Sequence, residues 1–211
     1  MDSGNRLGDM EITDPKAMRA LAHPVRLAVL ERLQRHGPAT ATQLSPHVGA
    51  TPSVTSWHLR HLAGFGLVRD AEGGTDRRTR RWEAVARGFR VRVPEDAEGT
   101  SAARALSWEM FARAAELPER WATETEPGLE PAWRRLSGLA NTRIVVSADE
   151  LAAIGDAVEA VLAPYVTRDA GERPVGSRGV RLLRYVLPEG GDAADGAVDS
   201  AEDSDGSGAI A

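Results

Sequence analysis

The stretch from Thr51 to Val68 (TPSVTSWHLRHLAGFGLV) constrains the fold most, because as a helix its side chains separate onto two faces. One face is apolar apart from one histidine and is predicted to be buried; its members are Val54, His58, Leu59, Leu62 and Phe65. The opposite face carries hydroxyls, an indole and a guanidinium, on Ser53, Ser56, Trp57 and Arg60. Exposed helix faces usually mix both charge signs. A face without acids, whose groups can hydrogen-bond to base edges, therefore indicates contact with DNA.

Caps and prolines place this helix in a series. Asp14-Pro15 and Thr51-Pro52 each supply an N-cap residue followed by a proline at the first helical position. The pattern predicts helices over 15–22 and 25–36, a short helix ending near Val48-Gly49, and then the two-faced helix, which ends at 64–66. Strands over 67–70 and 78–85 follow, joined by a Gly-Gly hairpin loop over 71–77. Helices followed by a hairpin predict a winged helix-turn-helix over residues 13–92.

The distribution of charge separates this region from the rest of the chain. The 211-residue protein has a formal net charge of −5. Residues 16–92 nevertheless hold 14 Lys+Arg against 5 Asp+Glu, whereas residues 1–15, 93–188 and 189–211 are each net acidic. A basic module between acidic flanks favours binding to a polyanion such as nucleic acid.

The remaining segments give the expected domain organisation. Residues 1–12 are expected to be a flexible N-terminus, and residues 93–100 an acidic linker. Residues 101–188 are expected to form a C-terminal helical or αβ domain for dimerisation or sensing. Its elements are a helix over 101–117, a strand over 142–146, a helix that begins with a capping box at Ser147 and Glu150, and a strand over 180–187. Residues 189–211 are expected to be a disordered acidic tail. The predicted fold class is mainly α with small β (α+β).

Several classes of protein are disfavoured by composition. The chain has no cysteine, which excludes disulfides and thiolate chemistry. No apolar stretch approaches the ~20 residues of a membrane span, and no export signal is present, so a cytoplasmic protein without membrane contact is expected. No catalytic constellation is found, so neither enzyme activity nor a cofactor is predicted. The histidines have ordinary structural explanations, and no metal site is predicted; they are His23, His36, His47, His58 and His61.

Two sequence blocks and a basic strand carry a family resemblance. The first block is Leu21–Leu27 (LAHPVRL) with Val29-Leu30, and the second is Ser56–Leu59 (SWHL) with Leu62 and Gly66–Val68. Arg77–Trp82 is similar to a basic wing. With these blocks, residues 13–92 resemble the winged-helix domain of the ArsR family of bacterial transcriptional regulators. The C-terminal region more loosely resembles an extension found in actinobacterial members.

This resemblance implies a homodimer that binds double-stranded DNA at a palindromic operator, often as a repressor released by a metal or another signal. The segment where that family carries thiolate ligands is Thr42–Val48 (TQLSPHV), which has no cysteine. Thiolate metal sensing is therefore excluded, and the effector, including an unknown small molecule, is left open.

The residues predicted to bind DNA lie on the two-faced helix and the wing. Ser53, Ser56 and Arg60 are the expected readers of base edges, since arginine can form a bidentate contact with guanine. Thr51 is expected to cap the helix and direct its N-terminus at a phosphate. Trp57 packs either on a deoxyribose or thymine methyl, or on a neighbouring helix, and both interpretations stay open. The wing is expected to contact phosphates or the minor groove through Arg77, Arg78 and Arg80.

Alternatives remain at this stage. The apolar side of the 101–117 helix, with the first helix, forms the dimer surface or packs on the C-terminal domain. The winged helix is alternatively a protein-interaction module. A third interpretation is a ligand-responsive regulator whose C-terminal domain binds a small molecule near the 167–179 loop, with Tyr165, Glu172, Arg173 and Arg178.

Overall fold

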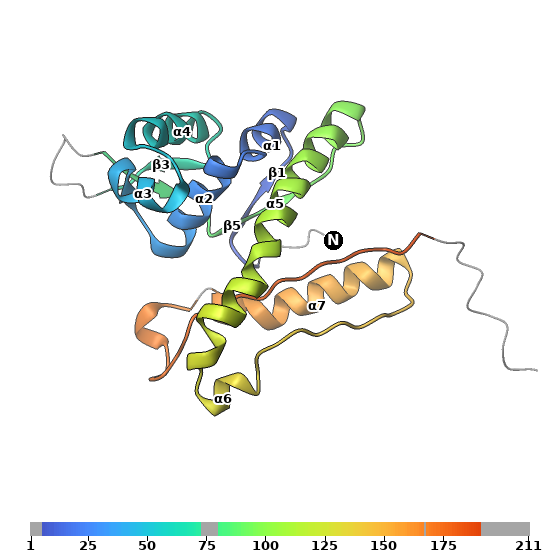
Figure 1. Cartoon of the computed structure of the whole chain (residues 1–211). Helices are drawn as coiled ribbons and strands as arrows, with labels where there is room; N and C mark the ends of the chain where they lie inside the picture. The colour runs from blue at the N-terminus through green and yellow to red at the C-terminus, as the bar shows by residue number, and fades with distance from the viewer. Residues whose placement is uncertain (1–5, 73–79, 167, 191–211) are drawn as a thin grey trace, which may run out of the picture. The chain divides into compact units, whose positions relative to one another are not determined.

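A computed structural model describes residues 6–72, 80–166 and 168–190 (Figure 1). The chain divides into two units, Met1–Ser177 and Arg178–Ala211. All helices and strands assigned in the described residues belong to the first unit. In the second, residues 178–190 have no assigned helix or strand.

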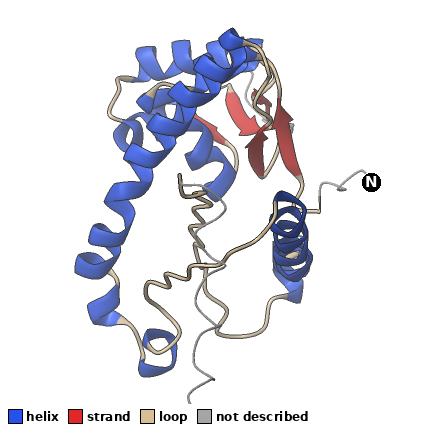
Figure 2. Cartoon of the chain, turned by 90° about the vertical axis from the view of Figure 1, so that its right-hand side faces the viewer, coloured by secondary structure: helices blue, strands red, loops and turns tan. Residues whose placement is uncertain are grey.

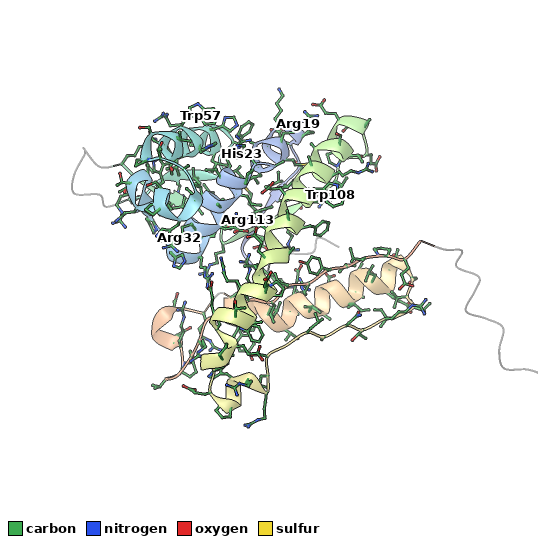
Figure 3. All side chains as sticks on the ribbon, viewed as in Figure 1. Arg19, His23, Arg32, Trp57, Trp108 and Arg113 are labelled. Carbon is green, nitrogen blue, oxygen red and sulfur yellow. The ribbon has the colours of Figure 1, made fainter. Side chains whose placement is uncertain are left out.

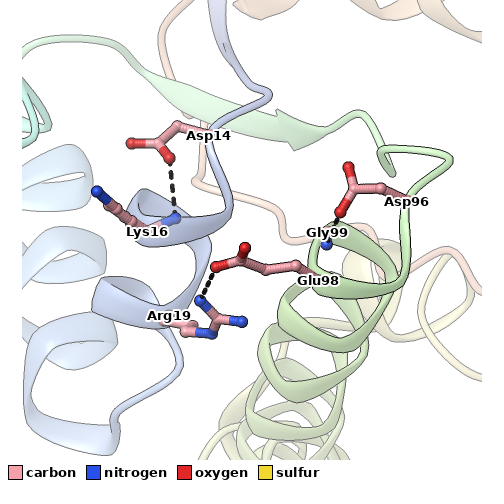
Figure 4. Close-up of polar contacts among 6 residues, drawn as sticks. All are labelled: Asp14, Lys16, Arg19, Asp96, Glu98 and Gly99. Carbon is pink, nitrogen blue, oxygen red and sulfur yellow. Dashed lines mark hydrogen bonds and ion pairs between the residues drawn. The ribbon is translucent and has the colours of Figure 1, made fainter.

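The N-terminal helices begin and end at the residues that the caps predict. They are α1 (Pro15–Leu21), α2 (Pro24–His36), α3 (Ala41–Val48) and α4 (Pro52–Gly64). The Asp14 carboxylate accepts a hydrogen bond from the Lys16 amide at 2.9 Å, which caps α1 (Figure 4). Helix α3 ends at Gly49, whose φ of 67° favours glycine because a side chain is strained there. The helical part of the predicted winged-helix domain is confirmed.

Two small sheets lie among these helices (Figure 2). The antiparallel sheet has the strand order β2 (Ala39–Thr40), β4 (Arg81–Ala84), β3 (Val68–Asp70). In its register Trp82 lies opposite both Ala39 and Asp70. The second sheet pairs β1 (Asp9–Ile12) in parallel with β5 (Gly88–Val91). A β-hairpin after α4 completes the winged helix, so the mixed fold of helices with small sheets is confirmed.

One hydrophobic core holds this part of the chain together. It draws a buried side chain from nearly every N-terminal element, including Met18, Leu30, Leu44, Leu59 and Trp82. Helix α5 (Ala97–Glu124) adds Ala102, Ala103 and Leu106 to the same core. Burying each large aliphatic side chain contributes about 1.5–3 kcal/mol, so the core fixes how α4 is presented.

Helix α5 is fixed to the winged helix by polar contacts as well. Asp96 caps it by accepting a hydrogen bond from the Gly99 amide at 2.8 Å, and Glu98 pairs with Arg19 of α1 at 2.6 Å (Figure 4). Two helical turns beyond Leu106, Arg113 pairs with Glu31 of α2 at 2.8 Å. The remaining elements are η1 (Glu126–Gly128), α6 (Pro131–Arg134), α7 (Ala148–Val166) and η2 (Ala170–Glu172).

Three expectations for the N-terminal half are wrong. Residues 1–12 are not flexible throughout, because Asp9–Ile12 forms β1; its partner β5 is 79 residues away, so no local pattern signals the pairing. Residues 93–100 are not all linker, since α5 begins at Ala97. The helix expected over 101–117 runs to Glu124 with Pro118 in its interior. The segment Met1–Asn5 lies outside the described residues.

The prediction of two strands in the C-terminal region is also wrong. Neither residues 142–146 nor residues 180–187 belong to a strand in the described part of the chain. An alternating β-branched sequence favours a strand only where a partner supplies hydrogen bonds. The capped helix between them does form, with the reciprocal Ser147–Glu150 capping box that the sequence predicts. Residues 191–211, which make up most of the predicted acidic tail, lie outside the described residues.

Candidate nucleic-acid interface

Helices α3 and α4 form the helix-turn-helix. A capping box starts α3: the Gln43 amide donates to the Thr40 hydroxyl at 3.2 Å, and the Gln43 side chain accepts from the Thr40 amide at 2.9 Å. The turn to α4 uses the left-handed Gly49. The Thr51 hydroxyl then accepts from the Val54 amide at 3.4 Å, which confirms Thr51 as the cap of α4.

The outer face of α4 consists of Ser53, Ser56, Trp57 and Arg60. Ser53 and Arg60 are exposed, Ser56 is half-buried, and the Trp57 side chain is 51% exposed (Figure 3). The Arg60 guanidinium donates to the Ser56 hydroxyl at 2.8 Å across one helical turn. The structure therefore brings together on one exposed surface the four residues that the sequence places there.

The inner face of α4 differs from the prediction by one residue. Val54 is 45% exposed and does not belong to the buried stripe, which is Thr55, His58, Leu59 and Leu62. These positions are spaced i, i+3, i+4 and i+7, so the apolar pattern read from Val54 missed a buried threonine. The Thr55 hydroxyl has no hydrogen-bond partner among the described residues.

Trp57 packs on side chains of its own helix. Its ring stacks on His61, with centroids 5.4 Å apart and planes 14° apart. His61 in turn meets Phe65 edge-on at 5.3 Å. The indole is thus supported on one side by α4 itself, while half of its surface is open to solvent.

Two histidines meet beneath α4. His23 caps α2 by accepting from the Val25 amide at 3.2 Å, and its ring lies 4.9 Å from that of His58. His58 is 5% exposed, and its Nδ1 has no partner in the described part of the chain. Burial is the largest cause that lowers the pKa of His58 to about 4, and the nearby His23 is the second. Burial likewise lowers the pKa of His23. Both rings are therefore neutral near pH 7, and His58 is a core residue as predicted.

The wing presents fewer free charges than its sequence indicates. Arg80 forms a bidentate pair with Asp70, whose Oδ2 accepts from Nη2 at 2.8 Å, and its guanidinium lies 3.9 Å above the Trp82 ring. In the same sheet Arg69 pairs with Glu83 at 2.7 Å. Arg77 and Arg78 lie outside the described residues. The partnership of Arg80 with Asp70 was missed because it depends on the strand register.

The described residues were also compared with the requirements of a metal site and of a membrane span. No group of three or more His, Cys, Asp or Glu side chains in the described ranges is arranged to hold a metal ion. Within the same ranges, no helix is both long and apolar enough to span a bilayer.

Comparison with known proteins supports the same class. Residues 21–71, which contain α2 to β3, match the model of a helix-turn-helix domain family. The comparison with curated proteins returned no match. With the winged-helix fold, the helix-turn-helix match supports a DNA-binding transcriptional regulator.

Several solved structures are similar at low identity. The YusO protein from Bacillus subtilis is 15% identical over 70% of this chain and 79% of its own, with a TM-score of 0.31. NMB1585, a MarR family regulator from Neisseria meningitidis, is 19% identical over 67% and 79%, with a TM-score of 0.30. RV1404 from Mycobacterium tuberculosis is 18% identical over 69% and 84%, with a TM-score of 0.29. These values are too low to carry an argument about this chain.

Proposed function

We propose that the protein is a homodimeric transcriptional repressor of the ArsR type, which binds a palindromic operator through two copies of α4. The observation that carries the proposal is the outer face of α4, where exposed Ser53, Trp57 and Arg60 with half-buried Ser56 present donors and an aromatic ring without an acid. The resemblance of Leu21–Leu27 and Ser56–Leu59 to that family supports the ArsR assignment.

Arg60 is the central base reader in this proposal. Its bond to Ser56 at 2.8 Å uses one guanidinium nitrogen and holds the side chain along the helix. The other nitrogens retain donors for the O6 and N7 acceptors of guanine, a contact worth about 1–3 kcal/mol of discrimination. Ser53 and Ser56 supply hydroxyls for neighbouring bases or phosphates. Trp57, supported by His61, is placed to pack on a sugar or a thymine methyl.

The wing adds affinity in this proposal. Because Asp70 already neutralises Arg80, we assign most of the wing's attraction for phosphate to Arg77 and Arg78, with Arg80 positioned by Asp70 and Trp82. Each phosphate neutralised contributes about −0.9 to the slope of log affinity against log salt. Binding that does not change with salt would contradict this role.

Helix α5 supplies the dimer surface that we propose. Beyond the core contact it exposes Trp108 at 69%, Phe111 at 43% and Met110 at 39%. Trp108 and Phe111 meet edge-on at 6.5 Å beside an apolar hollow of about 430 Å³ that Arg104 and Ser107 also line. Large exposed apolar patches mark interfaces. A Trp108→Glu variant is expected to sediment as a monomer at concentrations where the wild type is a dimer, while its circular dichroism is unchanged.

Selection of bound duplexes from random DNA tests the function directly. The proposal predicts an inverted repeat whose half-sites are about 10 bp apart, or a small multiple, with two chains per duplex. Enrichment of no sequence, or of a single half-site bound by one chain, would contradict it. The first result would favour a protein-docking role for the winged helix instead.

A further inference from the structure

A hollow lies between the C-terminal end of α2 and helix α3, apart from the outer face of α4. It has a volume of about 340 Å³, and its lining includes Arg32 and His36 of α2 and Gln43 and His47 of α3. Arg32 and Trp57 are well separated in Figure 3. The hollow therefore does not belong to the interface described above.

The polar side chains of this hollow are mainly donors. Arg32 is half-buried and forms no hydrogen bond or ion pair with any described residue. The Gln43 side-chain oxygen already accepts from the Thr40 amide at 2.9 Å, which leaves its NH₂ group as the available part. The carbonyl oxygen of Pro38, another lining residue, already accepts from Arg81 at 2.8 Å. With these two oxygens occupied and the donors of Arg32 and Gln43 available, the hollow fits an anion.

The charges around the hollow are also of one sign. Burial is the largest cause that lowers the pKa of His36. The next causes are Arg32, Arg35 and His47, and no acid acts on it. Glu31, on the same helix, is paired with Arg113 at 2.8 Å. A cluster of positive groups without a counter-charge attracts anions.

Stabilisation of the helix end does not explain the whole cluster. Basic residues in the last turn interact favourably with the carbonyl end of a helix, which accounts for Arg35 and His36. The end of α3 accounts for His47 in the same way, but neither helix end accounts for the half-buried Arg32, which lies one turn earlier in α2.

We propose that Arg32, His36, His47 and the Gln43 amide form a binding site for a phosphate-type oxyanion. Two sources offer this chemistry. One is a DNA backbone phosphate beside the operator, since α3 directly precedes the recognition helix. The other is a free anion, either inorganic phosphate or a phosphorylated small molecule. The DNA source rests on the proposed function, whereas the free anion does not.

The site has a defined dependence on pH. The basic side chains around it are Arg32 and His36 from α2, His47 from α3, and Arg81 from β4, whereas Arg35 of α2 acts on His36 from outside the lining. Imidazole binds an oxyanion best when protonated, and the pKa of His36 lies below its ordinary value. Oxyanion affinity is therefore expected to rise as the pH falls from about 8 to about 6.

Titration of the full-length protein with inorganic phosphate at constant ionic strength tests the free-anion arm. The imidazole NMR signals of His36 and His47 are expected to shift and saturate, with chloride as the matched salt. Arg32→Gln is expected to weaken this binding by about fivefold or more, because a charge-assisted donor is lost. Arg35→Gln removes the same charge outside the hollow and is expected to leave the affinity within about twofold of the wild type.

The same pair of variants tests the DNA arm. If a backbone phosphate occupies the site, Arg32→Gln reduces the salt slope of DNA binding by about 0.9, and Arg35→Gln retains the wild-type slope. If phosphate shifts the imidazole signals but Arg32→Gln does not change the salt slope of DNA binding, the site exists and its ligand is a free anion. The proposal is overturned if Arg32→Gln and Arg35→Gln have equal effects in both experiments, or if neither variant has an effect in either experiment. If the wild type binds no DNA, the proposed function fails, and the phosphate titration alone decides whether this site exists.

Discussion

The winged helix and the region after α5 use apolar residues in opposite ways. Between Ile12 and Leu106, helices and strands share one core whose largest members, including Met18, Leu21 and Leu62, are fully buried. After Leu106, Leu129 is the only buried hydrophobic side chain in the described residues. The most exposed large residues of this later part include Leu136, Leu139, Val145 and Val175. One half of the chain completes its own core, and the other does not.

Helix α7 makes the contrast specific. It is well capped, yet none of its described side chains is buried, and Val161 and Tyr165 are 67% and 66% exposed. Its polar contacts to the winged helix include Glu159 with Arg90 of β5 at 2.7 Å. The hydrogen bond to Glu159 is the largest of the causes that raise the pKa of Arg90. Local signals such as a cap are therefore sufficient to form a helix, whereas burial of its side chains requires a partner surface.

Core truncation should give the largest difference between the two regions. Leu59→Ala removes a fully buried side chain beneath α4 and is expected to lower the free energy of unfolding by about 2–5 kcal/mol. Leu139→Ala makes the same change at a side chain that is 97% exposed, and should stay within about 0.5 kcal/mol. Urea denaturation of both variants gives the comparison. Similar losses would show that the region after α5 also carries a core.

Acid should act on the winged helix through His58. Its folded-state pKa of about 4 is below the ordinary 6.5, so the unfolded chain takes up the proton first. The stability from neutral His58 is complete above about pH 6.5 and is lost as the pH falls towards 4, by about 2 kcal/mol at pH 5. Urea denaturation from pH 7.5 to pH 5 measures the loss. His58→Leu should remove this part of the slope, whereas His47→Gln, at an exposed position, should retain it. An unchanged slope in His58→Leu would contradict the assignment.

Removing a helix cap sharpens the same comparison at a smaller scale. Thr51→Ala is expected to lower the free energy of unfolding by about 1 kcal/mol, because α4 is part of the core. Ser147→Ala removes the capping box of α7, whose hydrogen bonds also lower the pKa of Glu150. It should fray α7, visible as faster amide exchange, with less than about 0.5 kcal/mol lost in global unfolding. Equal global losses would refute the contrast.

The sequence was most informative where the signals are local. Caps at Asp14, Thr51 and Ser147 and the glycine stops fixed the helix boundaries closely. The outer face of α4 followed from helical spacing alone. The inner face was misread at Val54 because a small polar residue, Thr55, occupies the core position.

Features that depend on distant pairing could not be predicted in this way. Strand β1 needs β5, and the neutralisation of Arg80 by Asp70 needs the register of β3 on β4. Conversely, residues 142–146 have the composition of a strand but belong to no sheet in the described structure. Periodicity reports which face is apolar, but not whether a partner is present to cover it.

The central claim is that the outer face of α4 reads DNA sequence, and Arg60→Ala tests it most directly. The control is Arg120→Ala, an exposed arginine of α5 whose ion pair with Glu124 spans 4.0 Å. Affinities of both variants are measured for the selected operator and for a scrambled duplex of equal length. We expect Arg60→Ala to reduce the preference for the operator by about 1–3 kcal/mol per half-site, with Arg120→Ala retaining it. An Arg60→Ala protein that keeps the full preference would contradict the account.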